Sequence, residues 1–83
     1  MTIDDATIFQ EICRLLQPFN TKGIKLSLKT DMTTDMQIDS VSVMDFIMEI
    51  EDRFDIDIPL NLLADTRTLE DLLKVVRAQM ENA

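Results

Sequence analysis

Three stretches of this 83-residue chain repeat apolar residues with the period of an α-helix, and no two stretches alternate apolar and polar residues as paired strands do. Each repeat places its apolar residues on one side of a helix, and that side must be buried against other helices. The pattern predicts an all-α fold. The predicted core residues are Ile8, Ile12, Leu15, Leu16 and Phe19 in the first stretch, Val43, Phe46, Ile47, Ile50 and Phe54 in the second, and Leu69, Leu72, Leu73, Val76 and Met80 in the third.

Local signals mark the ends of these helices. Thr2-Ile3-Asp4-Asp5 has the spacing of a capping box, and Pro18 with the glycine-containing segment 20–23 ends the first helix around residues 17–20. Asp39 is a good N-cap for a second helix over residues 40–54.

The C-terminal part carries two further helix signals. Pro59 is favoured at the first position of a helix, which predicts a short helix over residues 59–64. Thr68 and Asp71 have the spacing of a capping box at the start of the last helix.

Residues 24–38 are predicted to form a long loop. Ile24, Leu26 and Leu28 alternate with polar residues as in a strand, but no second alternating stretch could pair with them. We expect the loop to hold these three side chains against the helices. The whole chain, residues 1–83, is therefore predicted to be one four-helix bundle domain with three longer helices, one short helix and a long loop after the first helix.

The charge is large and unevenly distributed. The chain has a net charge of −8; residues 31–57 hold nine acids and one base, whereas residues 14–30 hold four bases and no acid. A field of this sign repels phosphate backbones, so we expect no nucleic-acid partner.

The residues that are missing exclude most hydrolases that use a histidine base, and they exclude glycine-rich phosphate-binding loops. Without histidine the chain has no imidazole base, and one glycine is too few for a phosphate-binding loop. Cys13 is the single cysteine, which fits a reducing compartment. The chain shows neither a signal peptide pattern nor an apolar run of membrane-spanning length. We therefore expect a cytoplasmic, monomeric protein that is not an enzyme and does not insert into membranes.

Asp31, Asp35 and Asp39 suggest a calcium loop, but the pattern does not fit. Their spacing of four differs from the alternate ligands, central glycine and final glutamate of an EF-hand. We predict that these are solvated carboxylates of the loop and the helix cap, and we predict no metal site.

Two features of the second predicted helix point to function. Ser40 occupies the first helical position, where free backbone N–H groups favour a phosphate ester. Val41, Met44 and Met48 lie on the side opposite the core residues, beside Asp45, Asp52 and Asp55. An apolar strip flanked by carboxylates favours docking of a basic partner with an apolar socket. The alternative is that the methionines pack under the loop or the third helix.

These residues carry a resemblance to acyl carrier proteins. Ile38-Asp39-Ser40-Val41 resembles the Asp-Ser-Leu attachment motif of that family, and Phe54-Asp55-Ile56-Asp57-Ile58-Pro59 is similar to its Phe-Asp-x-x-Ile-Pro sequence. Asp35 matches an acid that precedes the serine, and Thr68-Leu69 resembles the start of the fourth helix. Gln37 stands where the family usually has glycine, Val41 replaces leucine, and Arg53 interrupts the acidic run.

The resemblance implies that a phosphopantetheinyl transferase moves 4′-phosphopantetheine from coenzyme A onto Ser40. The arm would hold acyl groups as thioesters and deliver them to lipid, fatty acid or other specialised biosynthetic enzymes. Acyl-loading and acyl-transfer enzymes with basic docking patches would contact Asp39, Val41, Met44, Asp45, Met48, Glu51 and Asp52. The first, second and fourth helices and the segment 24–28 are the candidate walls of a shelter for the acyl chain.

Two other functions stay open. One is a carrier of activated amino acids, of the D-alanine type. The other is an unmodified interaction module whose acidic helix binds a basic partner. The intact mass of the protein from its native host separates a modified carrier from an unmodified module.

Overall fold

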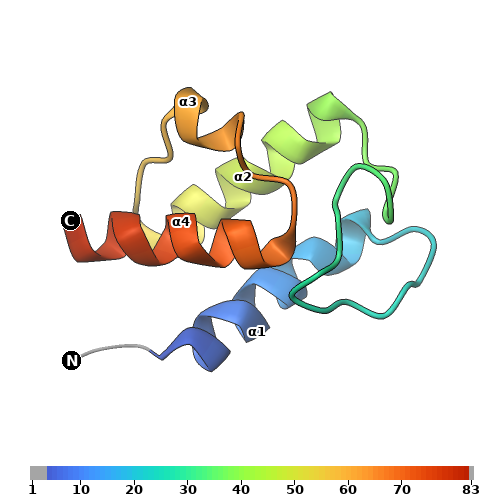
Figure 1. Ribbon diagram of the computed structural model, residues 1–83, viewed down its shortest axis with the longest axis horizontal. Coiled ribbons are helices and arrows are strands. Elements are labelled where there is room, and N and C mark those ends of the chain that lie inside the picture. Colours follow the sequence, from blue (N-terminus) through green and yellow to red (C-terminus); the bar gives the residue numbers. More distant parts are fainter. Residues whose placement is uncertain (1–3, 83) are drawn as a thin grey trace.

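The computed structural model describes residues 4–82, and within them the fold is helical (Figure 1). In chain order the elements are α1 (Asp5–Leu16), the 3₁₀ turn η1 (Gln17–Phe19), α2 (Ser40–Phe54), α3 (Leu60–Leu63) and α4 (Leu69–Asn82). The described residues form no strand, only an isolated bridge between Asp31 and Thr68. The predicted all-α bundle, with one short helix and a long loop after the first helix, is confirmed.

The core lies where α1 packs against both α2 and α4. Each predicted helical stripe contributes its central residues to the core, while Leu15, Phe19, Val43, Phe54 and Met80 are partly buried around it. The buried apolar residues are Ile8, Ile12, Leu16, Met32, Met36, Ile38, Phe46, Ile47, Ile50, Ile56, Ile58, Leu69, Leu72, Leu73 and Val76. Five of these, Met32, Met36, Ile38, Ile56 and Ile58, come from loops that the helical period does not cover.

The start of α1 differs from the predicted capping box. Asp4 is the N-cap, and its carboxylate accepts a hydrogen bond from Thr7 N at 2.9 Å. Asp4 takes this position because aspartate is a better N-cap than threonine. Thr2, the cap expected from the sequence, lies outside the described residues.

The capping box of α4 is confirmed. Asp71 N donates to Thr68 Oγ1 at 3.1 Å, and Thr68 N donates to Asp71 Oδ2 at 3.2 Å. The long loop satisfies further N–H groups of this helix, because Leu69 N donates to Thr30 O and Glu70 N to Leu28 O. The loop is thus joined by its backbone to the start of α4.

This backbone pairing corrects one expectation about the loop. Ile24 and Leu26 pack against the core as predicted, but Leu28 is 39 % exposed. Leu28 lies in a tight turn, closed by the hydrogen bond from Thr30 N to Ser27 O, and its carbonyl is used by α4. The side chains that this part of the loop buries are Thr30 and Met32 instead.

Candidate functional site

Ser40 is the first residue of α2, and Asp39 is its N-cap. Asp39 Oδ1 accepts a hydrogen bond from Ser42 N at 2.7 Å, and this bond lowers the pKa of the carboxyl below its usual value. The first intrahelical bond runs from Val43 N to Asp39 O at 2.9 Å. The cap therefore fixes the helix to begin at Ser40.

The Ser40 side chain is exposed and available for chemistry. Within residues 4–82, neither its hydroxyl nor the backbone N–H groups of Ser40 and Val41 form a hydrogen bond. Free N–H groups at the positive end of a helix stabilise an anion placed there. An anionic ester on Ser40 Oγ would therefore meet unoccupied donors next to the bond that holds it.

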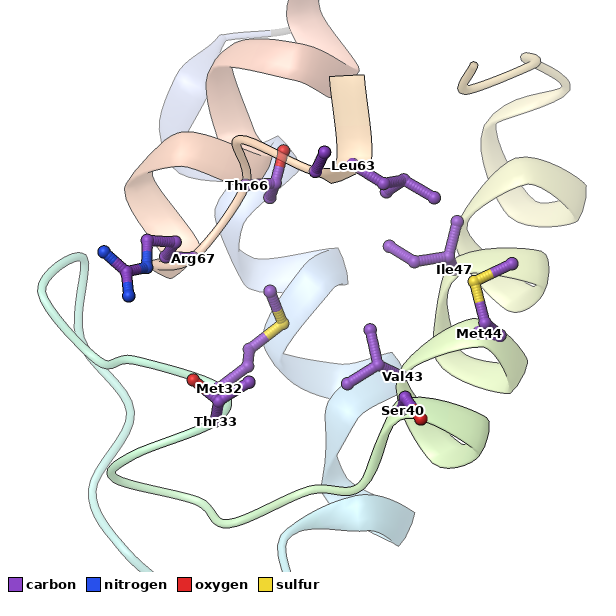
Figure 2. A pocket seen from close by; sticks show the side chains of 10 residues that line it. Met32, Thr33, Ser40, Val43, Met44, Ile47, Leu63, Thr66 and Arg67 are labelled. Atoms are coloured by element: carbon purple, nitrogen blue, oxygen red, sulfur yellow. The ribbon is translucent and has the colours of Figure 1, made fainter. Parts of the chain in front are cut away.

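A pocket of about 430 Å³ opens beside Ser40 (Figure 2). Side chains from α2, from α3 and from two loop segments surround it, and the apolar ends of Met32, Val43, Ile47 and Leu63 point toward one another across it. The lining residues are Met32, Thr33, Ser40, Val43, Met44, Ile47, Leu63, Ala64, Thr66 and Arg67. An apolar group attached near Ser40 has space to leave water here.

The walls of this pocket differ from those expected from the sequence. Of the expected walls, α2 alone lines it; α1, α4 and the segment 24–28 contribute none of its lining residues. The apolar stripes of α1 and α4 are already packed in the core, where Ile8, Leu69 and Val76 are fully buried. Helix α3 and the segments around Met32 and Arg67 supply the other side instead. No helical period marks these residues in the sequence.

The strip on the outer face of α2 is exposed as predicted. Val41 is 70 %, Met44 42 % and Met48 62 % exposed, whereas Phe46 and Ile50 on the inner face are fully buried. The alternative, that the methionines pack under the loop or α3, is wrong for Met48. Met44 lies at the edge of the pocket, between the exposed outer face and the buried inner face of α2. Asp45 and Asp52 are exposed on the same helix.

Glu51 is not the fully exposed docking residue that its place in the sequence suggests, but also forms hydrogen bonds within the fold. It is half-buried, and its Oε2 accepts a hydrogen bond from Ile58 N at 2.8 Å. Its backbone carbonyl accepts from Ile56 N at 3.0 Å, just after Asp55 takes up a left-handed conformation with φ of 55°. Glu51 thus ties the end of α2 to the segment that leads into α3.

The aspartates before α2 organise the loop. Asp31 Oδ1 accepts hydrogen bonds from Thr33 N and Thr34 N at 2.8 and 3.0 Å, and these bonds, with that of the Thr33 hydroxyl, lower the Asp31 pKa to about 2. Asp35 Oδ2 accepts from Asp31 N at 2.8 Å. Both carboxylates therefore accept backbone hydrogen bonds within the turn of residues 31–35.

Gln37 is left-handed, with φ of 54°. This conformation favours glycine, because a Cβ atom crowds the backbone there. The position is two residues before Asp39, where the resemblance leads one to expect glycine. The turn into α2 is therefore built with the geometry of a glycine but with a glutamine side chain.

Within residues 4–82, no helix has both the length and the apolar character needed to cross a membrane.

The comparisons with known proteins agree on one family. The family model "Phosphopantetheine attachment site" matches residues 6–76. A probable acyl carrier protein of Caulobacter vibrioides (strain NA1000 / CB15N) is 38% identical over 55 residues, which are 66% of this chain and 64% of that protein. An acyl carrier protein of Trieres chinensis is 33% identical over 63 residues, which are 76% of this chain and 79% of that protein.

A third relative is also named an acyl carrier protein. The acyl carrier protein of Kocuria rhizophila (strain ATCC 9341 / DSM 348 / NBRC 103217 / DC2201) is 31% identical over 51 residues, which are 61% of this chain and 63% of that protein. The chain thus matches somewhat less than two thirds of the length of the Caulobacter and Kocuria relatives. Because the family model spans most of the sequence and these relatives agree with it, the chain belongs to the acyl carrier protein family, whose members are carriers with covalently attached 4′-phosphopantetheine.

Proposed function

We propose that Ser40 is the attachment residue for 4′-phosphopantetheine and that the chain carries acyl groups as thioesters on this arm. The observation that carries the proposal is the placement of Ser40. Its exposed hydroxyl stands at the first position of α2, next to free backbone N–H groups and inside the region that the family model matches. The arm supplies a terminal thiol. The chain supplies the hydroxyl and the donors that stabilise the phosphate on it.

The chain depends on other proteins for catalysis. It has no histidine, and no described group that could act as a base contacts the Ser40 hydroxyl, so a phosphopantetheinyl transferase must remove its proton. Acyl-loading and acyl-transfer enzymes of a lipid or other specialised pathway then exchange the cargo. The chain itself acts as a monomeric, non-enzymatic carrier in the cytoplasm.

The outer face of α2 is the proposed docking surface for these partners. Its exposed apolar side chains, Val41, Met44 and Met48, suit an apolar socket, and its carboxylates suit basic patches around that socket. Asp39 and Glu51 contribute charge although each already accepts a backbone hydrogen bond. The full set is Asp39, Val41, Met44, Asp45, Met48, Glu51 and Asp52.

The pocket beside Ser40 is the proposed shelter for the acyl chain. Its apolar lining favours an acyl cargo over the small polar cargo of an aminoacyl carrier. The family match argues against an unmodified interaction module.

The experiment is incubation of the purified chain with coenzyme A and a broad-specificity phosphopantetheinyl transferase, followed by intact mass measurement. We expect the wild type to gain one phosphopantetheine and Ser40→Ala to gain none. Ser42→Ala is the matched control, because Ser42 holds the cap through its backbone N–H and should be modified like the wild type. An unchanged wild-type mass, with a known carrier modified in parallel, contradicts the proposal. Cargo released from the native protein identifies the pathway.

A further inference from the structure

We infer that Arg67 determines cargo specificity and that the pocket beside Ser40 favours acyl chains ending in a carboxylate. The inference rests on the proposed function, because it concerns the cargo of the arm on Ser40. Its basis is the combination of an apolar pocket with one arginine at the edge, in a chain whose charge would otherwise repel an anionic cargo.

The body of the pocket suits an alkyl chain. Met32 and Ile47 are each 2 % exposed, and their side chains, with those of Val43 and Leu63, face the same space (Figure 2). Transfer of an alkyl chain from water to such walls is favourable in proportion to the area that is buried. These walls alone do not distinguish one end group from another.

The hydroxyl groups of the lining are already used as donors. Thr66 Oγ1 donates to Leu62 O at 2.8 Å, and Thr33 Oγ1 donates to Asp31 Oδ1 at 2.7 Å. Ser40 is taken by the arm under the proposed function. Arg67 therefore brings the remaining side-chain donors of the lining, and a guanidinium group binds a carboxylate through two parallel hydrogen bonds.

Arg67 differs from the other arginines of the chain. Arg14 and Arg53 both bind Glu11, and Arg77 binds Asp5. Within residues 4–82, the Arg67 guanidinium forms no ion pair and no hydrogen bond. Figure 2 shows it at the outer edge of the lining side chains, pointing away from the centre of the pocket. Its charge is thus available to a ligand in a protein with twice as many acids as bases.

The backbone of Arg67 is fixed beside the pocket. Its N–H donates to Asp71 Oδ2 at 3.2 Å, and its carbonyl accepts from Met32 N at 3.1 Å. Only the side chain needs to move to reach a ligand, which limits the conformational entropy lost on binding.

The net charge makes a local cation necessary for an anionic cargo. At physiological ionic strength the Debye length is about 8 Å, so distant basic residues contribute little at the pocket. The acids of α2 lie on the same helix as Ser40 and disfavour a carboxylate there. Arg67 is the one basic residue of the pocket lining, and it offsets this repulsion once its side chain turns toward the pocket.

In the test, a broad-specificity phosphopantetheinyl transferase loads the chain with acyl-phosphopantetheine from matched coenzyme A thioesters. Adipyl is compared with hexanoyl, and suberyl with octanoyl, so that each pair differs only at the end of the chain. Intact mass confirms loading before any further measurement. Thermal melting is then recorded for the wild type, for Arg67→Gln, and for Lys22→Gln, which removes one exposed charge away from this pocket.

In the wild type we expect at least one carboxylate-ended form to melt about 4 °C above its methyl-ended partner. Arg67→Gln should abolish this difference, Arg67→Lys should retain part of it, and Lys22→Gln should leave it unchanged. The difference should shrink in high salt, because ions screen the pair.

Three results overturn the inference. The first is equal melting temperatures for the carboxylate-ended and methyl-ended forms of the wild type. The second is a difference between these melting temperatures that persists in Arg67→Gln. The third result is an equal change in melting temperature on Arg67→Gln when the arm carries no acyl group and ends in a free thiol. Arg67 would then bind the phosphate of the arm and not the end of the cargo. Failure to load the wild type would instead contradict the proposed function, and the mass measurement reveals it before melting.

Discussion

Arg53 on α2 donates a hydrogen bond from its Nε to Glu11 Oε1 on α1 at 2.7 Å, joining two helices that also share the core. Arg14 binds the same carboxylate from within α1. The two arginines together lower the pKa of Glu11 to about 2, from an ordinary value of 4.5. The residue that interrupts the acidic run of α2 therefore links α2 to α1 by an ion pair at the edge of their shared core.

The first prediction concerns acid. A carboxyl whose folded pKa is lowered contributes stability above its unfolded pKa, and this contribution is lost as the pH falls through the folded pKa. For Glu11 the loss should run from about pH 5 to about pH 2, and the melting temperature measures it. Glu11→Gln removes this dependence, so the difference between wild type and variant should shrink across that window. A constant difference would contradict the assigned pairing.

The second prediction concerns the cap of α2. Asp39→Ala should destabilise the protein by about 1 kcal/mol, because Ser42 N loses its acceptor. Asp39→Ser keeps an acceptor without charge and should retain most of the stability. If the carboxylate also contacts partners, Asp39→Ser should slow modification by the transferase while it melts close to the wild type. Equal rates for Asp39→Ser and wild type would remove Asp39 from the docking surface.

The third prediction separates the inner and outer faces of α2. Ile50→Ala truncates a fully buried side chain and should destabilise the fold by about 2 to 5 kcal/mol in denaturant unfolding. Met48→Ala changes a side chain that is 62 % exposed and should leave the free energy of unfolding within about 0.5 kcal/mol of the wild type.

The same variants test the docking surface. Met48→Ala and Asp52→Lys should weaken transferase or acyl-loading activity, and the loss in Asp52→Lys should shrink at high salt. Normal activity in both variants would show that partners do not bind the outer face of α2.

The fourth prediction concerns the left-handed turn before α2. Gln37→Gly should stabilise the fold by about 1 kcal/mol, because glycine adopts a φ of 54° without steric strain. Gly23 gives the converse control: its φ is +63°, and a Cβ atom there would meet nothing within 4 Å. Gly23→Ala should therefore destabilise by about 1 kcal/mol through backbone strain alone. A loss of stability in Gln37→Gly would mean that the glutamine side chain contributes more than its backbone strain.

Helix α2 could be predicted from the sequence with both of its ends. Asp39 and the periodic residues up to Phe54 are local signals, and the structure places the helix between them. The opposed faces of α2 follow from the same period, which explains why the outer strip could also be predicted. The expectation for Ser40 rested on the start of this helix together with the resemblance of residues 38–41 to the family's attachment motif.

The pocket could not be predicted from the sequence. Met32, Leu63 and Arg67 come from separate parts of the chain, and the backbone bond from Met32 N to Arg67 O brings two of them together. Backbone hydrogen bonds leave no side-chain period in a sequence, so neither this junction nor the outward position of Leu28 had a visible signal.

The brevity of α3 sets how the pocket responds to its contents. Its four residues include none that is fully buried, and no side chain caps its start, yet Leu63 forms one wall of the pocket. The walls formed by α2 and by the segment around Met32 belong to parts of the chain with residues buried in the core. Moving α3 outward therefore sacrifices less apolar burial than moving any other helix. We therefore expect the pocket to widen at α3 when a larger group enters it, while the side formed by α2 keeps its position.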